Sequence, residues 1–327
     1  MPQKILITGG AGFIGSWLAE KLLAGGKKVF VIDNLSTGRF DNIKHLTGDA
    51  NFHCEVADIF DEPKLKVLID QVDYVCHLGA AVGVKRVMEQ PLKSLETNIR
   101  GTQLVLELAS EKKKPVLLTS TSEVYGENGH LPFTEESDRV FGSVYNHRWG
   151  YALSKAIDEF LVLAYWRERG LPTVVVRLFN TVGPRQVSDY GMVLPTFVKQ
   201  CLRKEPLTIH GSGNQRRCFC YVTDVVEGLV KIIQSDRVFG EVFNLGSTEE
   251  ITIKALALKV KELTNSQSEI TYTPYHQAYG DGFEDMERRV PDISKAQRLL
   301  GYQPQHSLDE IIKRVSSYQR EEIAGLV

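Results

Sequence analysis

Short apolar runs alternate with longer amphipathic segments through the first 180 residues of the chain. The apolar runs predict six buried strands, at residues 4–8, 28–32, 51–55, 74–78, 116–119 and 173–177. Helical spacing of apolar residues predicts helices between several of them, notably at residues 13–24, 92–112 and 151–169. Strands and helices that alternate in this way form parallel sheets with crossover helices. The pattern therefore predicts an α/β fold with a doubly wound parallel sheet, as in a Rossmann domain.

The pattern becomes irregular after Asn180, where prolines at positions 184, 195, 206, 274 and 291 interrupt it. Three further helices are predicted at residues 223–234, 253–264 and 308–323. We expect a Rossmann domain at residues 1–180, which also receives strands or helices from about 215–247, and a smaller α/β subdomain at 181–327. Because open α/β sheets bind ligands at the carboxyl ends of their strands, the smaller subdomain is expected to cover that edge.

Composition narrows the class of protein. The chain has 327 residues, 43% hydrophobic and 24% charged, which is typical of soluble globular proteins. A net charge of -2 argues against nucleic acid or a membrane surface as a partner. No apolar run reaches the roughly 18 residues of a transmembrane helix, and the first strand begins too early for a signal peptide. We therefore expect a cytoplasmic protein.

The cysteines do not indicate a metal or redox site. Their number is odd and they contain no Cys-x-x-Cys pair, so we expect buried thiols, no metal and a reducing compartment. The five are Cys54, Cys76, Cys201, Cys218 and Cys220.

A glycine-rich segment, Gly9-Gly-Ala-Gly-Phe-Ile-Gly15, joins the first predicted strand to the first predicted helix. Gly9 permits a tight turn, Gly12 lets the backbone approach a pyrophosphate, and Gly15 lets the helix pack on the strand. Phe13 and Ile14 begin the helix, whose free N–H groups then face the phosphates. The segment therefore predicts a dinucleotide site.

Asp33 ends the second predicted strand, where an acid binds the ribose hydroxyls of NAD and repels the 2′-phosphate of NADP. NAD is therefore the expected cofactor, although Arg39 is near enough in sequence to leave NADP open. Asp58 follows the third strand and could contact adenine or cap a helix. Other residues at strand ends are expected to line the same site, namely Asn34, Ile59, Leu78 and Ala80.

Tyr151 and Lys155 are four residues apart on a predicted helix and therefore share one face. A neighbouring ammonium lowers the pKa of a tyrosine and makes it useful for proton transfer. Thr121, Ser122 and Glu123 follow the fifth strand at the carboxyl edge of the sheet, so they are expected to face the cofactor and the tyrosine.

These motifs together resemble the extended short-chain dehydrogenase/reductase family. Residues 179–185, 211–219 and 290–295 are similar to its nucleotide-sugar epimerase, dehydratase and decarboxylase branch, and the resemblance covers nearly the whole chain. It implies that bound NAD takes a hydride from C4 of a UDP-sugar, giving a 4-keto intermediate. It also implies that the smaller subdomain binds the nucleotide sugar.

The resemblance also implies roles for individual residues. Tyr151 is implied as the base, Lys155 as a contact of the nicotinamide ribose, and Thr121 as a hydrogen-bond partner of the reacting hydroxyl. Asn98 matches the helix position that orients the lysine. The positions that hold the nucleotide diphosphate match Asn180 and Arg217, and a guanidinium suits phosphate oxygens.

The Thr-Ser-Glu trio distinguishes the possible fates of the 4-keto intermediate. Ser122 stands where dehydratases carry an aspartate, and epimerases usually lack Glu123. The trio looks like that of UDP-glucuronic acid decarboxylases. Residues 141–151 and 279–291, which contain Arg148 and Arg289, resemble segments of the decarboxylases that form 4-ketopentoses and of UDP-apiose/xylose synthases. We therefore expect decarboxylation of UDP-glucuronic acid to a UDP-pentose, with Arg289 near the sugar carboxylate.

One departure favours an alternative. Met192 fills a position where such decarboxylases generally carry an arginine. Arg148, Arg185 or Arg289 could replace that arginine; otherwise a UDP-sugar 4-epimerase is the better interpretation. A catalytically silent NAD-binding regulatory protein and a dehydrogenase that releases NADH are further alternatives.

A homodimer is the expected assembly. The two helices predicted at 92–112 and 151–169 carry more apolar residues than one sheet face needs, and the family pairs these helices across a two-fold axis. The surplus positions include Leu104, Leu108, Phe160, Leu161 and Ala164.

Overall fold

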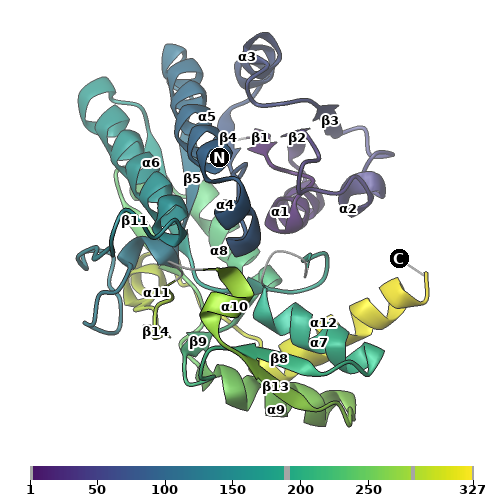
Figure 1. Ribbon diagram of the computed structural model, residues 1–327. Helices are drawn as coiled ribbons and strands as arrows, with labels where there is room; N and C mark the ends of the chain where they lie inside the picture. Colours follow the sequence, from purple (N-terminus) through teal and green to yellow (C-terminus); the bar gives the residue numbers. More distant parts are fainter. Residues whose placement is uncertain (1–2, 188–191, 281–283, 326–327) are drawn as a thin grey trace.

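A seven-stranded parallel sheet forms the centre of the computed structural model, which describes residues 3–187, 192–280 and 284–325 (Figure 1). The strand order is β11-β6-β5-β4-β1-β2-β3, and every neighbouring pair is parallel. The strands are β1 (Lys4–Thr8), β2 (Lys28–Asp33), β3 (Phe52–Val56), β4 (Tyr74–His77), β5 (Val116–Thr121), β6 (Thr173–Leu178) and β11 (Val242–Leu245). The predicted doubly wound α/β fold is confirmed, with all six expected strands within two residues of their predicted ends.

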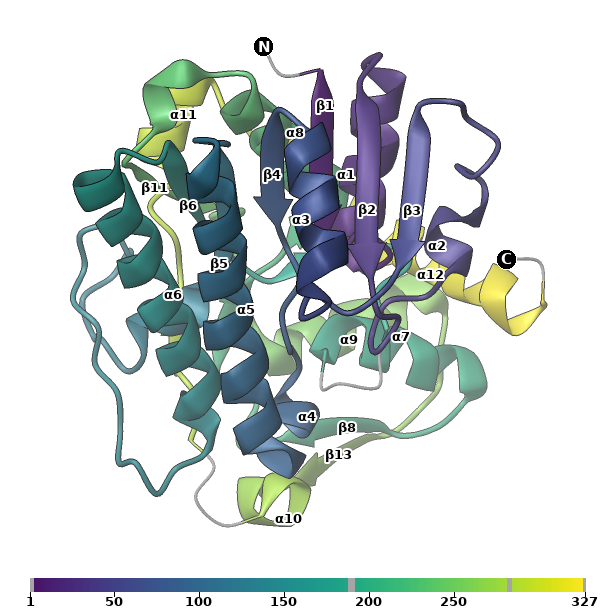
Figure 2. The same ribbon diagram turned by 90° about the horizontal axis from the view of Figure 1, so that it is seen from above.

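Helices cover both faces of this sheet (Figure 2). One face packs against α1 (Phe13–Ala24) and α8 (Val222–Ile233), and the other against α3 (Glu62–Gln71), α5 (Pro91–Glu111) and α6 (Arg148–Arg169). The strands read as nearly continuous apolar runs because helices bury them from both sides. Both α8 and β11 come from the expected segment 215–247.

A second group of elements lies beyond the carboxyl ends of the sheet, in the lower half of Figure 1. Its helices α7, α9 and α12 pack on one another, and α7 and α9 also pack on the parallel pair β8–β13. The three-stranded sheet β12-β9-β14 and the pair β10-β7 link this group to the main sheet. These elements are α7 (Val193–Arg203), α9 (Ile253–Thr264), α12 (Leu308–Ile323), β7 (Thr181–Val182), β8 (Leu207–His210), β9 (Arg216–Cys218), β10 (Cys220–Tyr221), β12 (Glu250–Thr252), β13 (Ile270–Thr273) and β14 (Arg288–Arg289).

The remaining described elements are short. They are α2 (Asp41–Lys44), α4 (Val84–Glu89), α10 (Tyr275–Tyr279), α11 (Ser294–Leu300) and two 3₁₀ helices, η1 (Ser122–Tyr125) and η3 (Asp236–Val238).

Two helix predictions need correction. Pro195 does not interrupt the structure but lies in the first turn of α7, where a proline costs no helical hydrogen bond. The helix predicted at 151–169 begins at Arg148, so this arginine lies in its first turn. The boundary between the two expected subdomains stays a prediction.

Candidate active site

A cavity of about 1190 Å³ lies where the carboxyl ends of the strands meet the second group of elements. It opens beside β1, between β2 and β4, where crossovers leave the central strand in opposite directions. This is the position at which doubly wound sheets bind ligands. Nearly all residues that the sequence assigned to a site line the cavity; the exceptions are Lys155 and Asn98.

The glycine-rich turn forms one wall of the cavity. Gly9 has a φ of +71°, and a Cβ there would lie 2.8 Å from Cα of Gly79. Gly12 is the N-cap of α1, and a Cβ on Gly15 would collide with the carbonyl of Gly9. Since Ser16 donates the first N–H that bonds back to Gly12, the preceding amides of α1 are free to hold an anion. This backbone surface fits a pyrophosphate.

Asp33 is fixed at the end of β2 by backbone donors. Its carboxylate accepts the N–H of Ala11 at 3.0 Å and that of Leu35 at 2.8 Å. Burial raises the pKa of Asp33, and these hydrogen bonds act against that rise. Arg39, the residue that left NADP open, pairs instead with Glu322 at 2.9 Å and does not line the cavity.

The neighbouring strand ends complete this half of the cavity, which Asn34, Asp58, Ile59, Leu78 and Ala80 all line. Asp58 accepts hydrogen bonds from the Asn34 amide at 2.8 Å and from the Phe60 N–H at 3.0 Å. The possibility that Asp58 caps a helix is wrong, because the N-cap of α3 is Asp61.

Thr121, Glu123 and Tyr151 meet at the centre of the cavity. The Thr121 hydroxyl accepts the N–H of Glu123 at 3.2 Å and is hydrogen-bonded to Tyr151. Burial raises the pKa of Tyr151, and the charges of Glu123 and Asp158 raise it further, while Arg148 and the Thr121 hydrogen bond act in the opposite direction. The pKa of Tyr151 is therefore raised in this structure and not lowered, with burial as the largest cause.

Lys155 is engaged elsewhere. Its Nζ lies 2.7 Å from Oδ2 of Asp158, one turn further along α6, and both side chains are at most 3% exposed. Asn98 does not contact Lys155 directly. Its side chain donates to Ser154 at 2.9 Å and accepts the N–H of Ala81 at 2.8 Å, so it ties α6 to the loop after β4.

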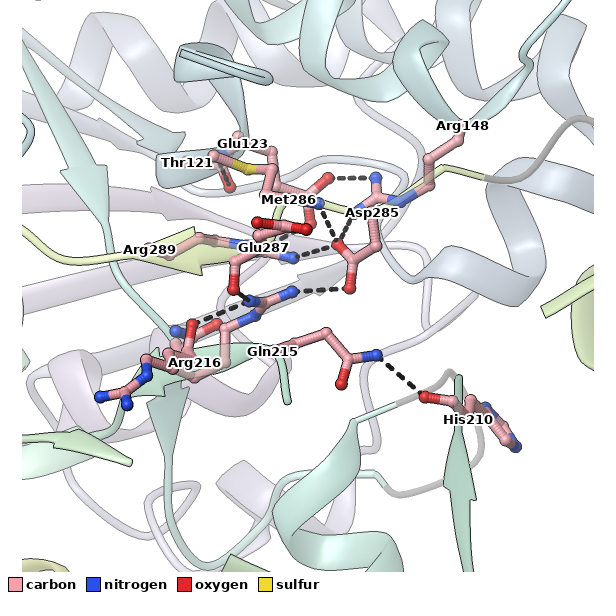
Figure 3. Close-up of polar contacts among 12 residues, drawn as sticks. Thr121, Glu123, Arg148, His210, Gln215, Arg216, Asp285, Met286, Glu287 and Arg289 are labelled. Atoms are coloured by element: carbon pink, nitrogen blue, oxygen red, sulfur yellow. Dashed lines mark hydrogen bonds and ion pairs between the residues drawn. The ribbon is translucent and has the colours of Figure 1, made fainter. Parts of the chain in front are cut away.

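Three arginines converge on two carboxylates beside Thr121 (Figure 3). Arg148 pairs with Glu123, and Arg289 contacts both Glu123 at 3.4 Å and Asp285 at 3.1 Å. Arg217 donates to Asp285 at 2.6 Å. The parallel pairing of β9 with β14 sets Arg217 directly opposite Arg289, which explains why an acid is needed between them.

The charge of this cluster is positive. Burial alone would raise the pKa of Glu123, but the guanidinium groups of Arg148 and Arg289 outweigh it and hold that pKa below its usual value. Asp285 likewise has a lowered pKa, because Arg217, Arg289 and Arg148 outweigh its burial. Three cations and two anions leave one positive charge at the centre of the cavity.

The other expected substrate residues lie around this cluster. Arg217 also donates to the carbonyl of Arg216 at 2.8 Å, and burial together with Arg289 lowers its pKa to about 10. Asn180 donates to the carbonyl of Cys218 at 3.0 Å and so joins β6 to β9. Both residues line the cavity.

Arg185 does not join the arginine cluster. Its guanidinium pairs with Glu20 at 2.7 Å and lies over the ring of Trp17. Three arginines could replace the one missing at position 192, and of these only Arg148 and Arg289 belong to the cluster. Met192 itself lines the cavity just before α7.

Asp285 and Asp158 were not named from the sequence. Asp285 lies in the segment 279–291 that carried the resemblance, but it is in a loop before β14, so no helical spacing indicated its ion pair with Arg289. Asp158 lies seven residues after Tyr151, on the same helical face. Residues 281–283 of the same segment lie outside the described residues.

The described residues contain neither a candidate metal site nor a candidate membrane span. Among the described residues, no group of three or more His, Cys, Asp or Glu side chains could hold a metal ion. Over the same part of the chain, no helix combines the length and apolar character needed to cross a bilayer.

A family model described as GDP-mannose 4,6 dehydratase matches residues 6–315. The chain belongs to this family. The GDP-mannose 4,6 dehydratase family includes nucleotide-sugar enzymes, so the expected branch of the extended short-chain dehydrogenase/reductases is confirmed.

Relatives with full-length similarity are named as decarboxylases. The UDP-N-acetyl-alpha-D-glucosaminuronate decarboxylase of Bacillus cytotoxicus is 39% identical over 322 residues, which cover 98% of this chain and 99% of the relative. UDP-glucuronic acid decarboxylase 1 of Xenopus tropicalis is 38% identical over 98% of this chain and 73% of the relative.

Several similar solved structures are epimerases. The UDP-glucuronic acid 4-epimerase of Bacillus cereus, in complex with UDP-glucuronic acid and NAD, matches with a TM-score of 0.88 and 30% identity, covering 98% of this chain and 99% of that one. The UDP-glucose 4-epimerase of Thermotoga maritima with UDP-glucose gives the same TM-score at 32% identity and the same coverage.

Proposed function

We propose that this protein is an NAD-dependent decarboxylase of a UDP-hexuronic acid, with UDP-glucuronic acid as the first substrate to test. The observation that carries the proposal is a cluster of three arginines beside Tyr151, namely Arg148, Arg217 and Arg289. Their three positive charges exceed the two negative charges of Glu123 and Asp285 by one. An arginine can hold a carboxylate through two parallel hydrogen bonds. The full-length similarity to named decarboxylases supports the same substrate class.

The cofactor half of the cavity suits NAD. Gly9 and Gly15 allow the tight turn, because a Cβ on either would collide with the backbone, and the turn leaves the amide end of α1 free to face a pyrophosphate. Asp33 presents a carboxylate for the ribose hydroxyls, and the pairing of Arg39 with Glu322 leaves no cation assigned to a 2′-phosphate. When bound, NAD supplies the acceptor for a hydride from C4 of the sugar. The similar epimerase structures contain NAD.

Tyr151 is assigned the first proton transfer. Its phenolic oxygen takes the proton of the C4 hydroxyl as the C4 hydrogen leaves as hydride, while the Thr121 hydroxyl fixes both groups by hydrogen bonding. Lys155 is assigned to the nicotinamide ribose, where its charge would favour the phenolate. This arrangement requires the ammonium to leave Asp158.

The arginines are assigned the second step. Arg148 and Arg289 hold the C6 carboxylate, and the C5–C6 bond then breaks as its electrons move into the 4-carbonyl. Carbon dioxide leaves and C5 takes a proton; return of the hydride to C4 and of the Tyr151 proton to the C4 oxygen would then give the UDP-pentose. Glu123 does not suit the delivery of the C5 proton, because a carboxyl with a lowered pKa between two guanidinium groups is an anion at neutral pH. We therefore assign Glu123 the positioning of both arginines, and a proton on C5 that comes from water.

The second candidate is a UDP-hexuronate 4-epimerase. The similar structure of a UDP-glucuronic acid 4-epimerase favours it. Both candidates need the arginine cluster to bind a uronate. The cluster therefore distinguishes a uronate substrate from a neutral hexose, but it does not distinguish decarboxylation from epimerisation.

The testing experiment offers four substrates separately and analyses products by mass. They are UDP-glucuronic acid, UDP-N-acetylglucosaminuronic acid, UDP-glucose and UDP-N-acetylglucosamine. The proposal expects loss of carbon dioxide from a uronate and no reaction of the neutral sugars. A product of unchanged mass with inverted C4 supports the epimerase instead, and inertness toward both uronates would reject the substrate class.

We also propose that the chain is a homodimer through α5 and α6, which lie side by side at the surface (Figures 1 and 2). The expected apolar face needs revision, because Leu108 is buried in the core of the monomer and Leu104 and Leu161 are partly buried. The exposed apolar stripe is Leu153, Ile157 and Phe160 on α6, at helical spacing. The cytoplasmic location and the nucleotide-sugar-binding role of the smaller subdomain stay predictions.

A further inference from the structure

A buried ion pair in α6 is not used by the mechanism above. Tyr151, Lys155 and Asp158 lie at helical spacing on one face, and Nζ of Lys155 is 2.7 Å from Oδ2 of Asp158. Asp158 is 0% exposed and Lys155 is 2% exposed. Such a pair adds little stability, because the cost of removing two charges from water offsets their attraction. A role in the site is the better explanation.

The second oxygen of Asp158 is buried, and the Thr102 hydroxyl beside the carboxyl favours its charged form. Within the described part of the chain, Oδ1 is buried and no donor meets hydrogen-bond geometry, although the Thr102 hydroxyl of α5 lies beside the carboxyl. Thr102 is 3.2 Å from Nε2 of His77, whose Nδ1 is 2.7 Å from the Thr8 hydroxyl. Burial and the charge of Lys155 lower the pKa of His77 to about 3, so this imidazole is neutral.

The pKa of Asp158 therefore depends on its burial and on a small number of neighbouring groups. Burial raises its pKa, Lys155 and Thr102 lower it, and Glu159 on the same helix raises it. Lys155 is the cation that acts most strongly to keep Asp158 ionised. Without it, a buried carboxyl beside Glu159 is neutralised by a proton from solvent.

We propose that Asp158 is a positioning residue that holds Lys155 away from the cavity in the ligand-free protein and takes up a proton when Lys155 turns to the cofactor. The proposal rests on the role assigned to Lys155 above. In this exchange the Nζ–Oδ2 hydrogen bond breaks, the ammonium keeps its charge, and an O–H bond forms on Asp158 with a proton from the buffer. The exchange conserves charge and protons and does not require the sugar substrate to be bound.

Calorimetry of NAD binding to the ligand-free protein tests this exchange. Titrations near neutral pH in buffers of different ionisation enthalpy give the number of protons taken up for each NAD bound. We expect uptake of about one proton by the wild-type protein and none by Asp158→Asn. Glu168→Gln is the control, because this acid of the same helix is exposed to solvent, and it should keep the uptake.

Lys155→Met gives a second test if Asp158→Asn does not fold. Its Asp158 lacks a cation from the start, so it should already be neutral and NAD binding should bring no proton. Binding by wild-type protein without proton uptake overturns the proposal, as does equal uptake by the wild type and Asp158→Asn. If NAD does not bind at all, the proposed cofactor is wrong, which is a separate result.

Discussion

Nη1 of Arg289 lies 3.4 Å from Oε1 of Glu123, although 166 residues separate the two in the chain. The contact joins β14 to the 3₁₀ helix η1 that follows β5, and it brings a cation beside Thr121. A sugar carboxylate would be a third partner of this cation, after Glu123 and Asp285. Discrimination between charged and neutral sugars should therefore depend on Arg289.

Arg289→Ala should lower kcat/KM for UDP-glucuronic acid by about 10- to 100-fold, because a charged hydrogen-bonded contact is lost. Binding of UDP-glucose, measured by calorimetry, should change much less. Arg288→Ala is the matched control, because the neighbouring side chain is 49% exposed and pairs with Glu250. Equal losses for both sugars would show that Arg289 does not read the carboxylate.

Glu123→Gln should destabilise the fold by about 3 kcal/mol at neutral pH, because it leaves buried arginines short of one anion. Arg148 and Arg289 hold the pKa of Glu123 below its usual 4.5, so the stability that it contributes is present above pH 4.5. That contribution is lost as pH falls through the lower, folded-state pKa. Denaturant unfolding of both proteins should therefore give a difference that shrinks below pH 4.5, and a constant difference would contradict the ionised state assigned to Glu123.

Tyr151→Phe should reduce turnover by about 10²–10⁴-fold while NAD still binds, because the ring remains and only the proton-transfer group is lost. Calorimetry of NAD binding and a turnover assay measure the two effects separately. Tyr145→Phe provides the control, since Tyr145 is 85% exposed and does not line the cavity. Near-normal turnover by Tyr151→Phe would remove the assigned base.

Phe160→Glu should separate the proposed homodimer into monomers. The side chain is 65% exposed at the C-terminal end of the apolar stripe on α6, and a carboxylate facing its own copy across a two-fold axis repels it. Sedimentation at micromolar concentration measures the mass, with Phe40→Glu as an exposed apolar control outside α5 and α6. A wild-type protein that sediments as a monomer would reject the dimer.

The main sheet and the cofactor loop could be predicted from the sequence because both depend on local patterns. Buried parallel strands give continuous apolar runs, and a glycine turn between strand and helix has a fixed spacing. The start of α6 was harder, because its N-cap His147 makes no side-chain capping bond that would mark it.

The ion pairs of the site needed the structure. Arg217 and Arg289 become neighbours only through the pairing of β9 with β14, and Asp285 then sits between their charges. The sequence indicated that Lys155 shares a face with Tyr151, but the competing partner Asp158 lies on that face as well. Spacing alone cannot decide which of the two neighbours the ammonium binds.

The most direct test of the central claim follows the C6 atom of the substrate. UDP-glucuronic acid labelled at C6 is incubated with the protein and NAD, and released carbon dioxide is counted while the sugar product is identified by magnetic resonance. We expect the label to leave as carbon dioxide and a UDP-pentose to form in equal amount. Label retained in a UDP-hexuronic acid with inverted C4 would contradict decarboxylation and establish the 4-epimerase in its place.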